Sequence, residues 1–115
     1  MGIFQTTVET RDNHKKEQLR THYYRNTFKQ VVKATEKIVN EENMIIHNLD
    51  ERYKEFYLVG DGFEVIVSVV EVTPAECAVD FKVNYFSTFG WGRPEKKAIH
   101  MFEKYDKHLN LKRKA

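Results

Sequence analysis

The stretch from Phe63 to Phe86 constrains the fold of this chain more than any other part of the sequence. Its second half, CAVDFKVNYF, alternates apolar and polar side chains, which is typical of a strand with one buried face. Its first half, FEVIVSVVEV, is apolar on both faces. The TPAE between the halves supplies turn residues, and the ring of Pro74 fixes its φ angle. We therefore predict a long antiparallel hairpin at the middle of a sheet.

The size and composition of the chain predict one domain, residues 1–115, with a single core. Of its 115 residues, 41% are hydrophobic and 31% are charged, as in ordinary globular proteins. The net charge is only +2, which argues against nucleic acid as a partner, because electrostatic binding of a phosphate backbone needs many Lys and Arg side chains on one face. No apolar run approaches the ~18 residues of a membrane-spanning helix, so we expect no membrane partner.

Cysteine usage and the N-terminal sequence both favour a cytoplasmic protein. Cys77 is the only cysteine, which excludes a disulfide within the chain. The first residues, MGIFQTTVETRDN, have neither the basic nor the apolar region of a secretory signal. We therefore expect the chain to work in a reducing compartment.

Two amphipathic helices are predicted, one before and one after the sheet-forming region. Both show the spacing of a 3.6-residue period, and Pro94 suits the first turn of the second helix. The first helix covers roughly residues 17–41, and its periodic residues are Tyr24, Phe28, Val31, Val32, Thr35, Ile38 and Val39. The second covers about residues 94–109, and its periodic residues are Ala98, Ile99, Phe102, Tyr105 and Leu109.

Four consecutive strands over residues 43–86 make up the predicted sheet. Residues 43–49 and 52–59 are the first two strands, and Asp61-Gly62 favours a tight turn into the hairpin. Residues 1–16 are either a loose arm or, over Ile3 to Glu9, a short edge strand. The sequence thus predicts an α+β fold of two layers, in which two helices cover one face of a four-stranded antiparallel meander.

The predicted element order, strand–helix–four strands–helix, resembles the TATA-binding-protein-like fold. The segments ETRDNH, LRTHYYR and AVDFKV are similar to segments of small uncharacterised cytosolic proteins of Bacillus-type bacteria. The fold resemblance concerns element order alone and implies no DNA binding. The family resemblance implies no particular activity, so no functional residue is carried over from it.

The outer face of the predicted sheet is more apolar than a solvated face should be. An exposed apolar patch of several hundred Å² usually marks an interface. We therefore expect a non-enzymatic interaction module, which forms a homodimer or binds a protein partner through this face. Scattered exposed apolar residues are the alternative interpretation. The outward-facing candidates are Ile66, Val70, Val72, Ala78 and Phe86.

The loop FGWGRP is the alternative candidate site, for a small ligand or an anion. A glycine-rich loop that opens a helix presents backbone N–H groups to an anion, and Arg93, Lys96 and Lys97 would add charge beside Trp91. Arg11 and His14 belong to a second segment in which cationic and aromatic groups alternate. The sequence favours the other interpretation of this loop, in which the glycines only let the chain turn while Trp91 closes the core. If the site does bind a small ligand, we expect that ligand between the sheet and the helices.

No catalytic, cofactor or metal residues are assigned from the sequence. The five histidines form none of the spacings that zinc sites use, and Cys77 has no CxxC partner. Cys77 also falls on the apolar parity of its strand, where a thiol behaves as a small hydrophobic side chain. Asp80, mid-strand among apolar neighbours, is expected to have a raised pKa if a partner covers it.

Overall fold

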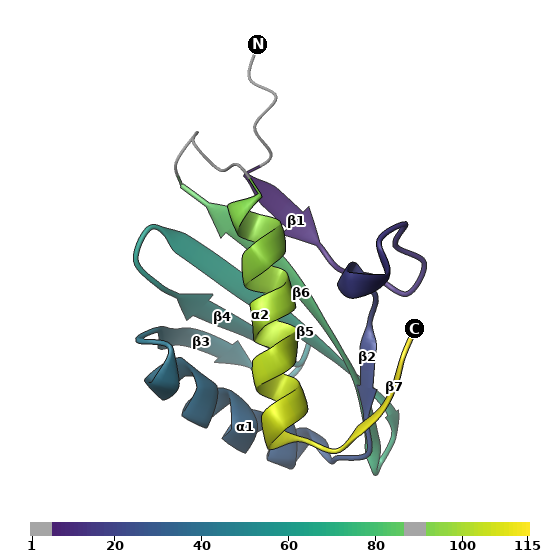
Figure 1. The fold of residues 1–115 in the computed structure, drawn as a ribbon. Coiled ribbons are helices and arrows are strands. Elements are labelled where there is room, and N and C mark those ends of the chain that lie inside the picture. The colour runs from purple at the N-terminus through teal and green to yellow at the C-terminus, as the bar shows by residue number, and fades with distance from the viewer. Residues whose placement is uncertain (1–5, 87–91) are drawn as a thin grey trace.

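The computed structural model describes residues 6–86 and 92–115, which form an α+β fold with two α-helices and a seven-stranded antiparallel sheet (Figure 1). The elements in chain order are β1 (Thr7–Glu9), the 3-10 helix η1 (Glu17–Leu19), β2 (His22–Tyr24), α1 (Phe28–Glu41), β3 (Ile45–Asp50), β4 (Glu55–Val59), β5 (Phe63–Thr73), β6 (Glu76–Tyr85), α2 (Arg93–His108) and β7 (Leu111–Lys114).

The sheet is built around β6. Its strand order is β3-β4-β5-β6-β2-β7, and β1 also pairs with β6. One edge of β6 pairs with β5 along its length, in the predicted hairpin. The other edge is shared, because β2 lies opposite Cys77 to Val79 and β1 lies opposite Lys82 to Asn84. The α+β class is confirmed, but the predicted four-stranded meander, which corresponds to β3 to β6, understates a sheet of seven strands.

The three additional strands are short. β1 and β2 have three residues each and β7 has four, which is too few for an alternating pattern to stand out in a sequence. Of the two interpretations of the N-terminal segment, the structure contains the edge strand, over Thr7–Glu9. Residues 1–5 lie outside the described residues.

The prediction of a helix from residue 17 is wrong, because α1 begins only at Phe28. Thr27 caps the helix: its hydroxyl accepts a hydrogen bond from the backbone N–H of Gln30, and the Gln30 side chain accepts one from the backbone N–H of Thr27. Upstream of this capping box, His22 to Tyr24 form β2 and pair with both β6 and β7. Tyr24 fits the helical spacing of α1, but it belongs to β2, and its side chain is fully buried in the core.

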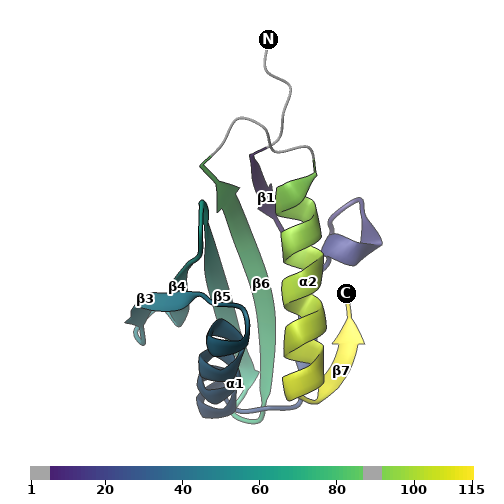
Figure 2. The ribbon, with the colours of Figure 1, turned by 60° about the vertical axis from the view of Figure 1, so that its left-hand side comes forward.

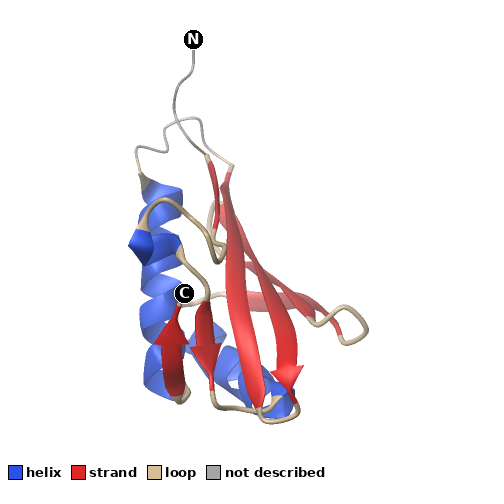
Figure 3. Ribbon diagram, turned by 90° about the vertical axis from the view of Figure 1, so that its right-hand side faces the viewer, coloured by secondary structure: helices blue, strands red, loops and turns tan. Residues whose placement is uncertain are grey.

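Both helices pack on the same face of the sheet (Figures 2 and 3). Their apolar stripes meet the inward residues of the central strands, which alternate as the sequence predicts. The opposite face carries no helix within residues 6–86 and 92–115. The fully buried core includes Val31 and Ile38 of α1, Val65 and Val67 of β5, Val79 and Val83 of β6, and Ala98, Met101 and Tyr105 of α2.

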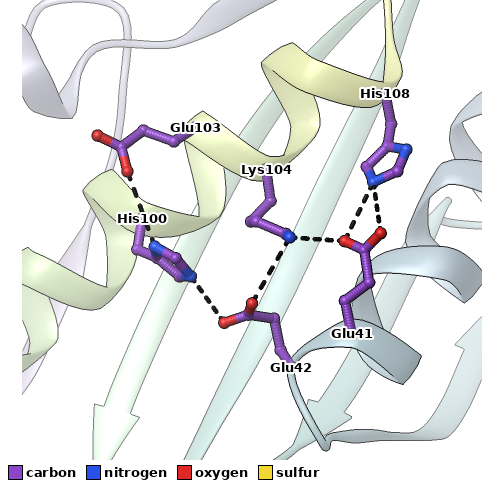
Figure 4. A network of polar contacts seen from close by, with 6 residues as sticks. All are labelled: Glu41, Glu42, His100, Glu103, Lys104 and His108. Carbon is purple, nitrogen blue, oxygen red and sulfur yellow. Dashed lines mark hydrogen bonds and ion pairs between the residues drawn. The ribbon is translucent and has the colours of Figure 1, made fainter.

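A row of polar side chains joins the two helices at their solvent-facing edge (Figure 4). Glu42 at the end of α1 contacts His100 Nε2 of α2 at 2.7 Å. Glu41 contacts Lys104 Nζ at 2.6 Å and His108 Nε2 at 3.1 Å. The hydrogen bonds from Lys104 and His108 lower the pKa of Glu41. These contacts fix the crossing of α1 and α2 and orient the His100 ring.

Candidate functional site

A depression of about 250 Å³ lies beside the first two turns of α2, and we name it the basic pocket. Its residues lie at positions 93, 96, 97 and 100, a spacing that puts side chains on one face of a helix. Gly92 precedes the helix with a φ of +76°, a backbone conformation that residues other than glycine rarely adopt. The lining residues are Tyr85, Arg93, Lys96, Lys97 and His100.

Aromatic rings hold two of the pocket's cations in place. The Arg93 guanidinium lies 4.6 Å from the centroid of the Tyr85 ring, and Lys97 Nζ lies 4.6 Å from that of Phe63. The two rings stack on each other at 5.2 Å. Burial raises the pKa of Tyr85 although Arg93 opposes it, so the phenol stays neutral at pH 7. The arrangement restrains cationic side chains through cation–π contacts rather than through carboxylates.

The positive charge of the basic pocket is not neutralised within the chain. Arg93, Lys96 and Lys97 form no salt bridge with any described residue, whereas Lys16, Lys54 and Lys104 each do. The undescribed residues 1–5 and 87–91 contain no Asp or Glu that could serve as a partner. His100 is the exception, since its two ring nitrogens face Glu42 and Glu103 (Figure 4). Three cations that form no ion pair within the described part of the chain therefore line one depression.

The candidate residues from the sequence are divided between two places. Arg93 and Lys96 line the basic pocket. Arg11 and His14 line a separate cavity of about 140 Å³, where slight burial and the Arg11 charge lower the pKa of His14. Trp91 lies outside the described residues. The second cavity also contains an ion pair, between Lys16 and Glu95 at 2.6 Å, so its charge is partly neutralised.

Two residues of the basic pocket, Tyr85 and His100, are not assigned from the sequence. His100 follows Arg93 and Lys97 at helical intervals, so the predicted helix could have placed it on their face. Tyr85 ends β6 on the inward parity, and its contact with Arg93 depends on how the helix packs on the sheet. Periodicity contains no information on that contact.

The sheet-face candidates are exposed to very different degrees. Val70 is 61% exposed, Val72 48% and Phe86 66%. Ile66 is half-buried, and Ala78 is only 7% exposed. Ala78 pairs with Val70 on one side and with Tyr23 on the other, so its small side chain lies between larger neighbours. Two of the exposed candidates, Val70 and Val72, therefore lie close to the turn between β5 and β6, whereas Phe86 follows the opposite end of the hairpin.

The chain matches no protein-family model, and it matches no curated protein. Among the described residues, no helix is both long and apolar enough to cross a membrane. The same residues contain no group of three or more His, Cys, Asp or Glu side chains that could hold a metal ion.

Proposed function

We propose that this chain is a binding domain for small molecules that carry an oxyanion, such as a phosphate group, and that the basic pocket is the binding site. The observation that carries the proposal is the convergence of Arg93, Lys96 and Lys97 without any carboxylate partner. An oxyanion would supply the missing counter-charge. Arg and Lys donate charge-assisted hydrogen bonds to such groups.

The aromatic contacts of Arg93 and Lys97 support this proposal. The cation–π contacts with Tyr85 and Phe63 restrain two of the cations before a ligand arrives, which lowers the entropy lost on binding. The depression is small and open, which suits an exposed anionic group rather than a fully enclosed molecule. Because binding would be largely electrostatic, the affinity should fall as the salt concentration rises.

The test is a titration with inorganic phosphate and pyrophosphate, followed by NMR shifts of the backbone amides of α2. We expect saturable shifts at Arg93 and at residues 95–100, and an affinity at least about tenfold lower in Lys97→Gln, because one charge-assisted hydrogen bond contributes roughly 1.5–3 kcal/mol. Lys107→Gln is the matched control, since Lys107 is exposed on the same helix and lies outside the pocket.

Two results would contradict the proposal. One is the absence of any saturable shift in the wild-type protein at low salt. The other is an equal loss of affinity in Lys97→Gln and Lys107→Gln, which would mean that the net charge of the helix, and not the pocket, attracts the anion.

Self-association through the outer sheet face is a second candidate function, supported by the exposure of Val70 and Val72 on a face without helices. Light scattering on a sizing column tests it. We expect a wild-type dimer that Val70→Lys converts into a folded monomer, because a charge in a packed interface would be desolvated. Glu36→Lys, on the exposed side of α1, should leave the mass unchanged. A wild-type monomer at high protein concentration would exclude this candidate.

A further inference from the structure

A second cavity beside α2 lies on another side of the helix from the basic pocket, and we name it the His22 cavity. Its volume is about 440 Å³, and it is bounded by η1, β2, α2 and β7. It shares no residue with the basic pocket. Its lining residues are Glu17, Gln18, His22, Ile99, Glu103, Asp106, Lys114 and Ala115.

His22 is held rigidly in the wall of this cavity. Only 4% of the residue is exposed. Its Nδ1 lies 2.9 Å from Asp106 Oδ1, and the Tyr24 hydroxyl donates to the same oxygen at 2.7 Å. The ring stacks on Phe102 with a centroid distance of 3.8 Å and an interplanar angle of 13°. Position and ring plane are therefore both fixed.

The contacts of Asp106 determine which ring nitrogen of His22 carries the proton. Burial opposes ionisation of Asp106, but the hydrogen bonds from His22 and Tyr24, together with the nearby charge of Lys114, lower its pKa. An ionised carboxylate only accepts hydrogen bonds, so Nδ1 must be the donor. In neutral His22 the lone pair is then on Nε2.

His22 Nε2 faces the cavity without a partner. No described residue makes a hydrogen bond with it, although His22 is more than nine-tenths buried. Every fully buried side-chain nitrogen and oxygen of the described residues has a partner, so Nε2 must reach the open space of the cavity. The protein thus presents a strong, oriented hydrogen-bond acceptor to whatever enters.

The other polar groups of the cavity are mostly acceptors as well. Glu17, Glu103 and Asp106 contribute three carboxylates, against the single ammonium group of Lys114, which is exposed. Glu17 forms no ion pair with a described residue, and Glu103 meets only His100, at 3.7 Å. The excess of acceptors and of negative charge in these walls favours a ligand that donates hydrogen bonds and carries positive charge.

We propose that the His22 cavity binds small molecules with a primary ammonium group, whose N–H donors bond to His22 Nε2 and to the carboxylates of Glu103 and Glu17. The three N–H groups of a primary ammonium match this set of acceptors. A quaternary ammonium has the same charge but no N–H to offer, and a carboxylate would meet the lone pair of Nε2 and be repelled. The proposal is independent of the basic pocket.

The experiment compares three probes by NMR of the His22 imidazole nitrogens in ¹⁵N-labelled protein. Propylammonium should shift the Nε2 resonance saturably, whereas tetramethylammonium and butyrate should leave it unchanged. The free protein should show the tautomer with the proton on Nδ1. Glu103→Gln should weaken propylammonium binding roughly two- to fivefold, as expected for an exposed charge. Glu95→Gln, on the same helix outside the cavity, should not.

Asp106→Asn provides the second variant. An amide at this position no longer requires Nδ1 to donate, so the proton should move in part to Nε2 and amine binding should fall about tenfold or more. Because Asp106→Asn alters buried contacts, Glu103→Gln keeps the test valid if that variant does not fold. The proposal is overturned if propylammonium and tetramethylammonium act equally, if neither changes the Nε2 resonance, or if the free protein carries the proton on Nε2.

Discussion

Asp80 shows how a single side chain joins two separate segments to the central strand. It lies at the point of β6 where β1 has ended and β2 has not yet begun. The hydroxyl of Thr10 donates to its carboxylate at 2.6 Å, and that of Thr21 at 2.8 Å. Burial is the largest influence and raises the pKa of Asp80, although both hydrogen bonds oppose it. Asp80 therefore holds both ends of the segment 11–20, which connects β1 to β2, against the central strand.

These contacts predict different effects for two substitutions of Asp80. Asp80→Ala should lower the free energy of unfolding by about 1–3 kcal/mol, because the buried hydroxyls of Thr10 and Thr21 lose their acceptor. Asp80→Asn should cost less, because the amide oxygen still accepts while the charge that burial disfavours is removed. Urea unfolding at pH 7 measures both values. A loss in Asp80→Asn equal to or larger than that in Asp80→Ala would refute this account.

At the scale of elements, the sequence predicts those helices and strands that are long enough to show several periods of apolar and polar residues. β5 and β6 have eleven and ten residues, and α2 begins and ends within one residue of its predicted bounds. β2 has three residues, and Tyr24 in it also satisfies the helical spacing of α1. The local capping signal at Thr27 and Gln30 competes with that periodicity and determines where the helix begins.

The same argument separates the predictable from the unpredictable part of each site. Arg93, Lys96, Lys97 and His100 share a face because of helix geometry, which the sequence contains. The His22 cavity instead joins β2 to residues of α2 more than eighty positions later, such as Asp106. That contact requires β2 to pair with β6 and α2 to cover it, so local pattern gives no signal for it. In the sequence, His22 is one of five histidines, and none of them has the residue spacing of a metal site.

At the scale of the whole molecule, carboxylates link α2 both to the sheet and to α1. Asp106 of α2 contacts His22 and Tyr24 of the sheet, and Glu41 of α1 contacts Lys104 of α2. Folding lowers the pKa of both carboxyl groups, that of Asp106 below its ordinary value of 3.8 and that of Glu41 below its ordinary value of 4.5. The unfolded chain therefore takes up protons at a higher pH than the folded protein does. These groups stabilise the fold above their ordinary pKa values, and that contribution is lost as the pH falls through the lowered ones.

We therefore predict that acid weakens the fold partly through these two contacts. The free energy of unfolding of the wild-type protein should decrease as the pH falls below about 4.5. The double variant Glu41→Gln and Asp106→Asn should start from a lower stability at pH 7 and decrease less steeply over the same range. Glu36→Gln, on the exposed side of α1, serves as the control and should follow the wild type.

Because the raised pKa of Asp80 acts in the opposite direction, the comparison is sharpest in an Asp80→Asn background, where that opposing contribution is absent. Urea unfolding at a series of pH values measures the slopes, and equal slopes for the double variant and its parent would show that neither contact governs acid stability.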